Sequence, residues 1–336
     1  MRNLLITLTV IVFPLATFSS LHAADDVGSI QDALVQYLSG NLDSAEILSH
    51  ILIHVQDTSA IPYICLGNIE CCRARDLKKK LMYDQVGPAL SRAIGYYRQA
   101  LAIQSNNPTA LINLSMSYYE LNQFEQARKF LVKALEIEPD NACALQNMGN
   151  ALFWVYDDSS DYRESIRYWT MALDLCSPEG KNRAVLWKNI GIAYYKMGNS
   201  DSAASAFRES LKLDSSSAET FVLLGRTLEI LEPYQAISFY KKALAIDSYY
   251  VSAIGAWTQA LCIISSPDLF TFGDKAMEVR KYIRQALKND PRNAPKYHLF
   301  LGDLYMAENK IGPAESEYVK ARELDSSLNL PSNWIK

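Results

Sequence analysis

The stretch 108–141 constrains the fold of this chain most strongly. Its sequence, PTALINLSMSYYELNQFEQARKFLVKALEIEPDN, contains two runs in which apolar side chains recur three, four or seven residues apart. That spacing places them on one face of a helix. The stretch therefore predicts two short helices that bury their apolar faces against each other. The apolar positions are Leu111, Leu114 and Tyr118 in the first helix, and Ala127, Leu131, Ala134 and Leu135 in the second.

Single residues predict where both helices begin and end. Asn107 can accept a hydrogen bond from the first turn, and Pro108 suits the first helical position, where its missing N–H costs nothing. Pro139 cannot continue the second helix, which must end before it. Small side chains let two helices approach closely, because the distance between helix axes follows the size of the contact residues. The closest approach is predicted at Ser115, Ala127 and Ala134.

The same order of large, small and aromatic positions recurs along nearly all of the chain, with a period of about 34 residues. The pattern resembles the tetratricopeptide repeat, a helical hairpin that stacks on its neighbours. The resemblance implies an all-α fold, an α-solenoid of tandem hairpins that forms one right-handed superhelix over residues 24–328. The hairpins are predicted at 26–59, 60–107, 108–141, 142–183, 184–217, 218–250, 251–294 and 295–328, followed by a tail at 329–336.

Two segments interrupt the repeat. The hairpin at 60–107 has roughly fourteen residues more than the common period. They include the basic run 73–80, interpreted as a solvated helix face, and Gly87-Pro88, interpreted as a turn. The second interruption, 264–273, is predicted to be an inserted loop, and such loops often carry function. Its Phe270 and Phe272 are predicted to contact a partner or a second copy of the chain, with packing onto the solenoid as the alternative.

Residues 1–23 have the features of a secretory signal peptide. Arg2 supplies the positive start, residues 4–16 are largely apolar, and residues 19–23 offer a small-residue cleavage site before Ala24. The apolar run is short for a membrane span, although an uncleaved leader that anchors the chain stays an alternative. We therefore expect an exported, periplasmic protein with no integral membrane segment once the leader is removed.

Charge and motif content argue against several classes of function. The chain carries 33 Lys and Arg and 37 Asp and Glu residues, and loss of the leader with Arg2 leaves 32 against 37, a net charge of −5. A nucleic-acid-binding protein would show a basic surplus instead. The sequence also has no HExxH, GxSxG, P-loop or dinucleotide-binding motif. We expect no enzymatic activity and no cofactor.

Metal and disulfide chemistry have weak signals. Glu46, His50 and His54 recur every four residues, which lets adjacent pairs share a metal, but the packing positions beside them turn this stripe toward solvent. His298 occupies a packing position and is interpreted as structural. The acidic residues at 157, 158 and 161 lack the Gly and distal Glu of a calcium loop. The six Cys residues form no CxxC motif and are interpreted as small apolar helix residues.

The family resemblance also predicts a binding groove, because the first helix of each tetratricopeptide hairpin lines the concave surface. Donors on successive hairpins can grip a carboxylate there, and Asn150, Lys188 and Arg226 resemble in part the carboxylate clamp of peptide-binding members. The full inward set is Asn68, Met116, Tyr119, Gln146, Asn150, Phe153, Lys188, Ile192, Tyr195, Arg226, Glu229, Gln259 and Asp303. The predicted groove residues among them are Tyr119, Gln146, Asn150, Phe153, Lys188, Tyr195 and Arg226.

These observations predict a scaffold that binds a protein or an extended peptide along its groove. The alternative is a small-ligand-binding periplasmic subunit associated with a solute-uptake system, which rests on analogy within the family. An enclosed apolar pore would favour the alternative, and an open polar groove favours the scaffold.

Overall fold

The computed structural model describes residues 42–55, 59–155, 159–177, 180–264 and 269–330. Within these residues the chain forms fifteen α-helices and one short 3₁₀ helix, and no strand. This confirms the predicted all-α fold. The chain forms two compact units, residues 1–177 and 178–336, and each is described by itself. The predicted single domain and its hairpin boundaries stay predictions.

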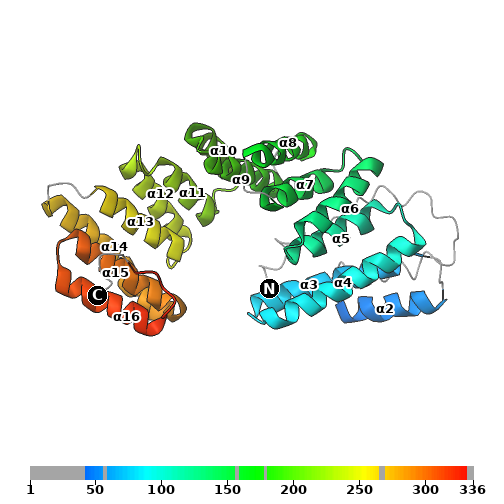
Figure 1. Cartoon of the computed structure of the whole chain (residues 1–336), viewed down its shortest axis with the longest axis horizontal. Helices are drawn as coiled ribbons and strands as arrows, with labels where there is room; N and C mark the ends of the chain where they lie inside the picture. The colour runs from blue at the N-terminus through cyan, green and yellow to red at the C-terminus, as the bar shows by residue number, and fades with distance from the viewer. Residues whose placement is uncertain (1–41, 56–58, 156–158, 178–179, 265–268, 331–336) are drawn as a thin grey trace. The chain divides into compact units, whose positions relative to one another are not determined.

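Consecutive helices pair as hairpins in both units, and within each unit the pairs stack one after another (Figure 1). The first unit contains α2 (Leu42–Val55), α3 (Ile61–Lys79), α4 (Tyr83–Ile103), α5 (Pro108–Glu120), α6 (Phe124–Ile137), α7 (Ala142–Val155) and α8 (Ser159–Leu175). The second contains α9 (Lys181–Lys196), α10 (Ser200–Leu213), α11 (Ala218–Leu228), α12 (Pro233–Ile246), α13 (Val251–Ile264), α14 (Leu269–Asn289), η3 (Pro291–Asn293), α15 (Ala294–Ala307) and α16 (Ile311–Leu324).

The stretch 108–141 folds as the sequence predicts. The side chain of Asn107 accepts a hydrogen bond of 2.9 Å from the backbone N–H of Ala110, which caps α5 directly before Pro108. Helix α6 ends at Ile137, two residues before Pro139. Ala127 and Ala134 are fully buried. The turn between the helices contains Asn122 with a positive φ of 58°, which Asn tolerates better than most residues.

One contact recurs inside five of the hairpins. A glycine in the first helix lies against an aromatic ring from the second helix, so closely that a Cβ atom at the glycine would come within 2.3–2.6 Å of the ring. Real Cβ atoms do not approach this closely, so only glycine fits without a shift of the ring. The pairs are Gly67 with Tyr97, Gly149 with Trp169, Gly191 with Phe207, Gly225 with Tyr240, and Gly302 with Tyr318.

Two predictions for the extended hairpin α3–α4 are wrong. Its turn lies at residues 80–82, where Leu81 has a φ of 60°, and not at Gly87-Pro88. Pro88 lies inside α4 although it removes a helical hydrogen bond. Val86, Ala89 and Leu90 are buried against Ala74 of α3, and this packing holds Pro88 in the helix. The basic run 73–80 is likewise not simply a solvated face, because Ala74 within it is buried.

The structure also differs from the prediction for 264–273, and several other predictions concern residues outside its described part. Helix α14 begins at Leu269, so Phe270 and Phe272 lie in its first turns and not in a loop that extends to residue 273. Their contact with a partner stays a prediction. Residues 1–41, which include the predicted leader and the first helix of the first hairpin, lie outside the described residues, as do Asp157 and Asp158.

A pair of glycine substitutions in one hairpin tests the glycine–ring contact. Gly67→Ala places a Cβ about 2.4 Å from the buried ring of Tyr97, so we expect a loss of about 1–3 kcal/mol of unfolding free energy. Gly95→Ala in α4 meets no atom within 4 Å, and we expect it to stabilise the chain by about 0.8–1.0 kcal/mol through helix propensity. Chemical denaturation of both variants measures the difference. Equal effects of the two substitutions would contradict the proposed contact.

Candidate functional site

The candidate site lies on the first helices of the hairpins. In the first unit α5 contacts both α3 and α7, and in the second unit α11 contacts α9 and α13. We call the surface of α3, α5 and α7 the first-helix surface. It carries the predicted inward residues Asn68, Met116, Tyr119, Gln146, Asn150 and Phe153. The second unit carries Lys188, Ile192, Tyr195, Arg226, Glu229, Gln259 and Asp303, which lie on or at the ends of its own first helices.

The residue after the glycine can accept a hydrogen bond from the ring that the glycine contacts. In three of the four hairpins whose ring carries a hydrogen-bond donor, the next residue of the first helix accepts from it. Three hairpins share this arrangement: Tyr97 Oη donates to Asn68 Oδ1 (2.7 Å), Trp169 Nε1 to Asn150 Oδ1 (3.0 Å), and Tyr318 Oη to Asp303 Oδ1 (2.9 Å). Because a buried donor without a partner is costly, these inward polar residues contribute to the hairpin itself.

In the two remaining hairpins, the residue after the glycine accepts no hydrogen bond from the ring. Phe207 has no donor, and the residue after Gly191 is the apolar Ile192. In α11 the position after Gly225 is Arg226, which cannot accept a hydrogen bond. There Tyr240 donates instead to Glu229, over 3.2 Å, and burial raises the pKa of that carboxyl. Some of the polar residues that the pattern leaves free for a ligand therefore already accept hydrogen bonds from side chains of the second helices.

Two of the three residues predicted to bind a carboxylate already have partners within the chain. Asn150 uses its oxygen to hold Trp169, and Lys188 Nζ forms an ion pair of 2.6 Å with Glu219 of the neighbouring α11. Arg226 is exposed. Asn150 lies in the first unit, and the two cations lie in the second. That all three share one surface stays a prediction.

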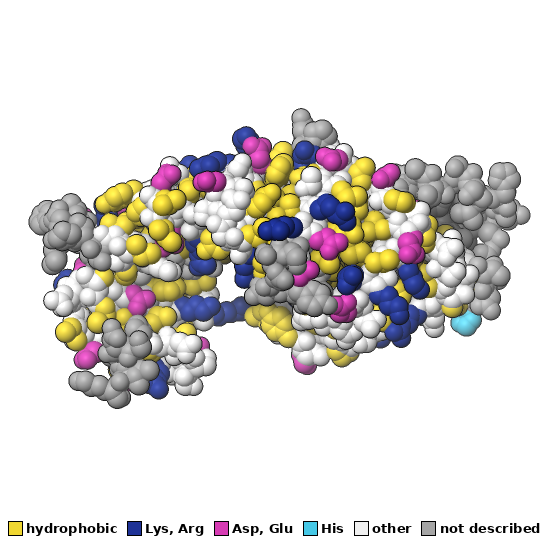
Figure 2. Space-filling model, turned by 45° about the horizontal axis from the view of Figure 1, so that its top comes forward, with side chains coloured by type: hydrophobic (Ala, Val, Ile, Leu, Met, Phe, Trp, Pro, Cys, Tyr) yellow, Lys and Arg dark blue, Asp and Glu magenta, His cyan; other side chains and the backbone are white. Residues whose placement is uncertain are grey.

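Aromatic side chains gather on the first-helix surface near the end of α7. The Trp154 indole lies near the Tyr119 hydroxyl of α5 and lowers its pKa, but burial outweighs this and raises the pKa. Phe153 packs edge-on against Trp154, with ring centroids 5.2 Å apart, and also contacts Tyr162 and Trp169. Trp154 is nevertheless 58% exposed, which is unusual for so large an apolar side chain. Figure 2 shows other hydrophobic side chains exposed between charged ones.

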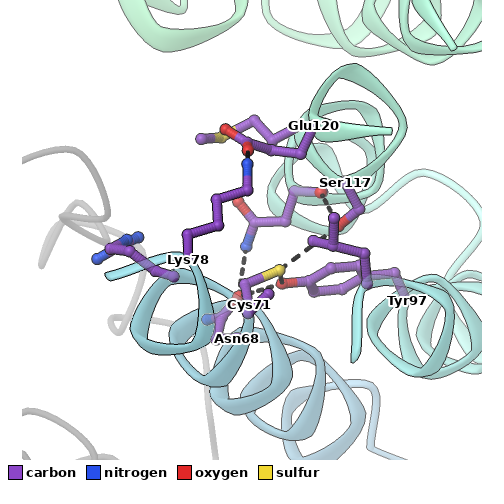
Figure 3. Close-up of a pocket in the computed structure, with 11 residues that line it drawn as sticks. Asn68, Cys71, Lys78, Tyr97, Ser117 and Glu120 are labelled. Carbon is purple, nitrogen blue, oxygen red and sulfur yellow. Dashed lines mark hydrogen bonds and ion pairs between the residues drawn. The ribbon is translucent and has the colours of Figure 1, made fainter. Parts of the chain in front are cut away.

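A cavity of about 230 Å³ opens between α3, α4 and α5 (Figure 3). At its base Asn68 Oδ1 accepts from both Tyr97 and Asn113, and Cys71 Sγ lies 3.5 Å from the hydroxyls of Tyr97 and Ser117. Burial raises the pKa of the Cys71 thiol, so it stays protonated at neutral pH. The lining residues are Asn68, Cys71, Ala74, Arg75, Lys78, Leu90, Tyr97, Asn113, Met116, Ser117 and Glu120.

An ion-pair network joins α3 to α2 and α4. Arg73 contacts both oxygens of Glu46 in α2, at 3.0 and 2.5 Å, and also Glu70, which pairs with Arg92 of α4. The guanidinium of Arg73 holds the pKa of Glu46 below its usual value. Glu46 thus serves the contact between helices. Its stripe partners His50 and His54 are exposed.

Other sites find little support in the described residues. They contain no group of three or more His, Cys, Asp or Glu side chains that can hold a metal. Their helices also include none that is long and apolar enough to cross a membrane. The six Cys residues, all of which lie in the described part of the chain, form no disulfide bond there. His298 Nδ1 lies 2.5 Å from Glu317 of α16, which agrees with a structural role.

Sequence reasoning missed two features of the site. Trp154 falls one residue after the predicted inward position Phe153, and only the structure shows that its ring stays exposed. The cavity depends on the extra turns of α3, which supply Ala74, Arg75 and Lys78. The signal available in the sequence was the insertion itself, although its length alone does not say what its side chains enclose.

Comparison with known proteins supports the tetratricopeptide repeat family. Models of this repeat match residues 89–148 and 184–217. A repeat-containing protein of Methanocaldococcus jannaschii is 26% identical over 181 residues, which is 50% of this chain and 31% of that protein. The chain spans 24–38% of the length of the first curated relatives that it matches.

Two solved structures show the same fold. The structure of Pseudomonas aeruginosa pilF covers 68% of this chain and 94% of its own, with a TM-score of 0.54 and 18% identity. The C-terminal part of a repeat-containing protein of Cytophaga hutchinsonii covers 76% of this chain and 96% of its own, with a TM-score of 0.55 and 16% identity. These likenesses agree with an α-solenoid of helical hairpins.

The hydrogen bond between Asp303 and Tyr318 gives a testable pH dependence. Burial raises the pKa of Asp303 above its ordinary value of 3.8, so the folded chain binds more protons than the unfolded one as the pH rises through that value, and stability falls. Asn occupies the equivalent position in two other hairpins. We expect Asp303→Asn to raise the melting temperature at pH 7, with a gain that shrinks toward pH 3.

Scanning calorimetry between pH 3 and 8 measures this dependence. Asp303→Leu is the contrasting variant, because it leaves the Tyr318 hydroxyl without its acceptor and should destabilise at every pH. A melting temperature for Asp303→Asn below that of the wild type at pH 7 would show that ionised Asp303 stabilises the fold.

Proposed function

We propose that this chain is an exported, non-catalytic scaffold that binds a protein or an extended peptide along the first helices of its hairpins. The observation that carries the proposal is the aromatic cluster on the first-helix surface, in which Trp154 is exposed and Phe153 and Tyr119 are half-buried. The repeat family supports it, because stacked hairpins of this type form extended binding surfaces.

The aromatic cluster has the properties of a binding anchor. Trp and Tyr are enriched among the residues that dominate binding energy, since they bury a large apolar area and keep a polar group. Trp154 already packs edge-on against Phe153, so its side chain loses less freedom when a partner covers it. Gln146, on the same helix, adds a half-buried amide to this surface.

The second unit carries an exposed aromatic side chain and two cations on its own first helices. Tyr195 of α9 is 43% exposed, and Lys188 lies on the same helix. Arg226 of the adjacent α11 is an exposed cation. We propose that these residues contact acidic groups of the same extended partner, with Lys188 exchanging Glu219 for a ligand carboxylate.

Substitution of the exposed Trp tests the proposed surface. Trp154→Ala removes the anchor, and we expect it to weaken the binding of a recombinant partner by about 2 kcal/mol or more. Tyr83→Ala is the matched control, because Tyr83 is 64% exposed but begins the second helix of its hairpin. Affinity capture from a periplasmic extract identifies the partner, and calorimetry then compares both variants.

Equal losses for Trp154→Ala and Tyr83→Ala would place recognition away from the first helices. Unchanged binding for both would exclude the aromatic cluster as an anchor. Circular dichroism of each variant verifies that the helices remain, since neither residue belongs to the buried core.

Export makes a separate prediction. The charged, apolar and small-residue regions of residues 1–23 support cleavage before Ala24. We expect the protein recovered from its native host to begin at Ala24 and to fractionate with periplasmic markers. N-terminal sequencing and intact mass measure this. A protein that retains Met1 or Arg2 in the cytoplasmic fraction would contradict export, and one that retains them in the membrane fraction would support the anchored alternative.

A further inference from the structure

In four of the second helices, an exposed cation is balanced within its own helix. A Lys or Arg of α6, α8, α10 and α16 forms an ion pair with a Glu three residues earlier. Residues at this spacing are neighbours on one helix face, so each pair leaves little net charge there. The pairs are Glu125 with Arg128, Glu164 with Arg167, Glu209 with Lys212, and Glu317 with Lys320.

Helix α14 differs from this pattern. Lys281, Arg284 and Lys288 are exposed, and none of them forms an ion pair with a described residue. The acid three residues before Lys281 is Glu278, but its carboxylate pairs instead with Lys241 of α12, over 2.6 Å. Arg284 and Lys288 have no acid three residues before them. These three cations of α14 are therefore not neutralised by their own helix.

The three cations lie in one row. Together with Met277 they recur four, three and four residues apart, which places their side chains on the same face of α14. All four line one hollow of the surface. The opposite face of α14 packs into the core, so this face points away from the rest of its unit. We call Lys281, Arg284 and Lys288 the basic row, which is about 10 Å long at 1.5 Å per residue.

The surrounding sequence adds to the positive charge. Residues 280–296 contain six Lys and Arg residues and one acid, Asp290, in a chain that has 33 basic and 37 acidic residues overall. Of these cations, Arg280 is buried and pairs with Glu308 over 2.6 Å. Arg292 and Lys296 are exposed. The second unit thus carries a positive patch in an otherwise acidic chain, and the complement of this patch is an anionic partner.

Composition and shape distinguish between an acidic protein and an anionic lipid surface as this partner. The centre of a protein interface is depleted in Lys and enriched in aromatic side chains. The basic row contains no aromatic side chain, and the exposed apolar side chain at its end is that of Met277. A lipid surface requires no such anchor, because each Lys or Arg near it contributes through charge. A straight, exposed row also lets its cations approach a flat surface together, which favours lipid.

We infer that α14 binds the surface of a membrane that contains anionic phospholipids, with Lys281, Arg284 and Lys288 against the lipid phosphates. This contact goes beyond the proposed function, because it uses a second helix of the repeat and needs no partner at the first helices.

Co-sedimentation of residues 24–336 with phospholipid vesicles tests the inference. The probe vesicles contain phosphatidylcholine and phosphatidylglycerol, and vesicles of phosphatidylcholine alone are the uncharged control. We expect binding to the anionic vesicles only. A rise in salt from about 0.1 M to about 1 M should abolish this binding, because the Debye length falls from about 10 Å to about 3 Å.

A triple substitution removes the basic row. We expect Lys281→Gln, Arg284→Gln and Lys288→Gln together to weaken binding to anionic vesicles on the order of 100-fold, because each cation near such a surface contributes about fivefold. All three side chains are exposed, so the fold should persist, and circular dichroism verifies this.

Helix α6 offers a matched control for this variant. Arg128, Lys129 and Lys133 line a hollow of α6 that also contains Glu125 and Glu136, so these cations are balanced by acids. Their joint substitution by Gln changes the net charge of the chain by the same amount as the triple substitution in α14. We expect this control to bind anionic vesicles nearly like the wild type.

A gain of binding provides a test that misfolding does not mimic. Asp274 is an exposed acid that lines the same hollow as the basic row, so its carboxylate would repel lipid phosphates. We expect Asp274→Asn to strengthen binding to anionic vesicles severalfold.

Defined outcomes would overturn the inference. Equal binding to both kinds of vesicle, or binding that withstands about 1 M salt, would contradict an electrostatic contact with anionic lipid. An equal loss in the α6 control would assign the effect to net charge and not to α14.

A fluorescent oligoglutamate peptide tests the other class of partner. If this peptide needs the basic row while the chain does not bind anionic vesicles, the row recognises an acidic protein segment and the inference is wrong. Trp154→Ala should leave vesicle binding unchanged, so the lipid contact and the proposed function can fail separately.

Discussion

The contact between a glycine of the first helix and an aromatic ring of the second sets the geometry of the hairpins. In five of them the ring occupies the space that a Cβ would fill, at 2.3–2.6 Å from its ideal position. The ring therefore fixes how closely the two helices approach and where along each other they cross. Each hairpin then presents its remaining apolar residues to the next, and stacking buries what one hairpin cannot bury alone.

This contact also decides much of the chemistry on the first helices. A Tyr or Trp ring brings a polar group into the interior, and that group needs a partner. Asn68, Asn150 and Asp303 provide it. Residues that look available for a ligand in the sequence are thus partly required by packing.

The insertion in α3–α4 shows how a repeat acquires an individual feature. Its added turns pack through Ala74, Val86, Ala89 and Leu90, so the extension stabilises itself. The same turns bring polar and charged side chains to the lining of the cavity between α3, α4 and α5.

The sequence by itself determined the all-α fold, the hairpin character of its repeats, the cap at Asn107 and the end of α6 before Pro139, because these depend on local periodicity and on single residues with fixed backbone preferences. The faces of the first helices that line a concave groove stay a prediction. The sequence misplaced the turn of the extended hairpin, since Gly87-Pro88 is a local turn signal that burial of Val86, Ala89 and Leu90 outweighs.

Only the tertiary structure decided what the inward residues do. The partner of Asn150 is a Trp 19 residues away, that of Lys188 is a Glu 31 residues away, and the residues of the cavity come from three helices. Such pairings depend on how the second helix lies against the first and on which neighbour stacks beside it. No spacing within a single helix specifies them, because they are set by contacts between elements and not by the period of the repeat.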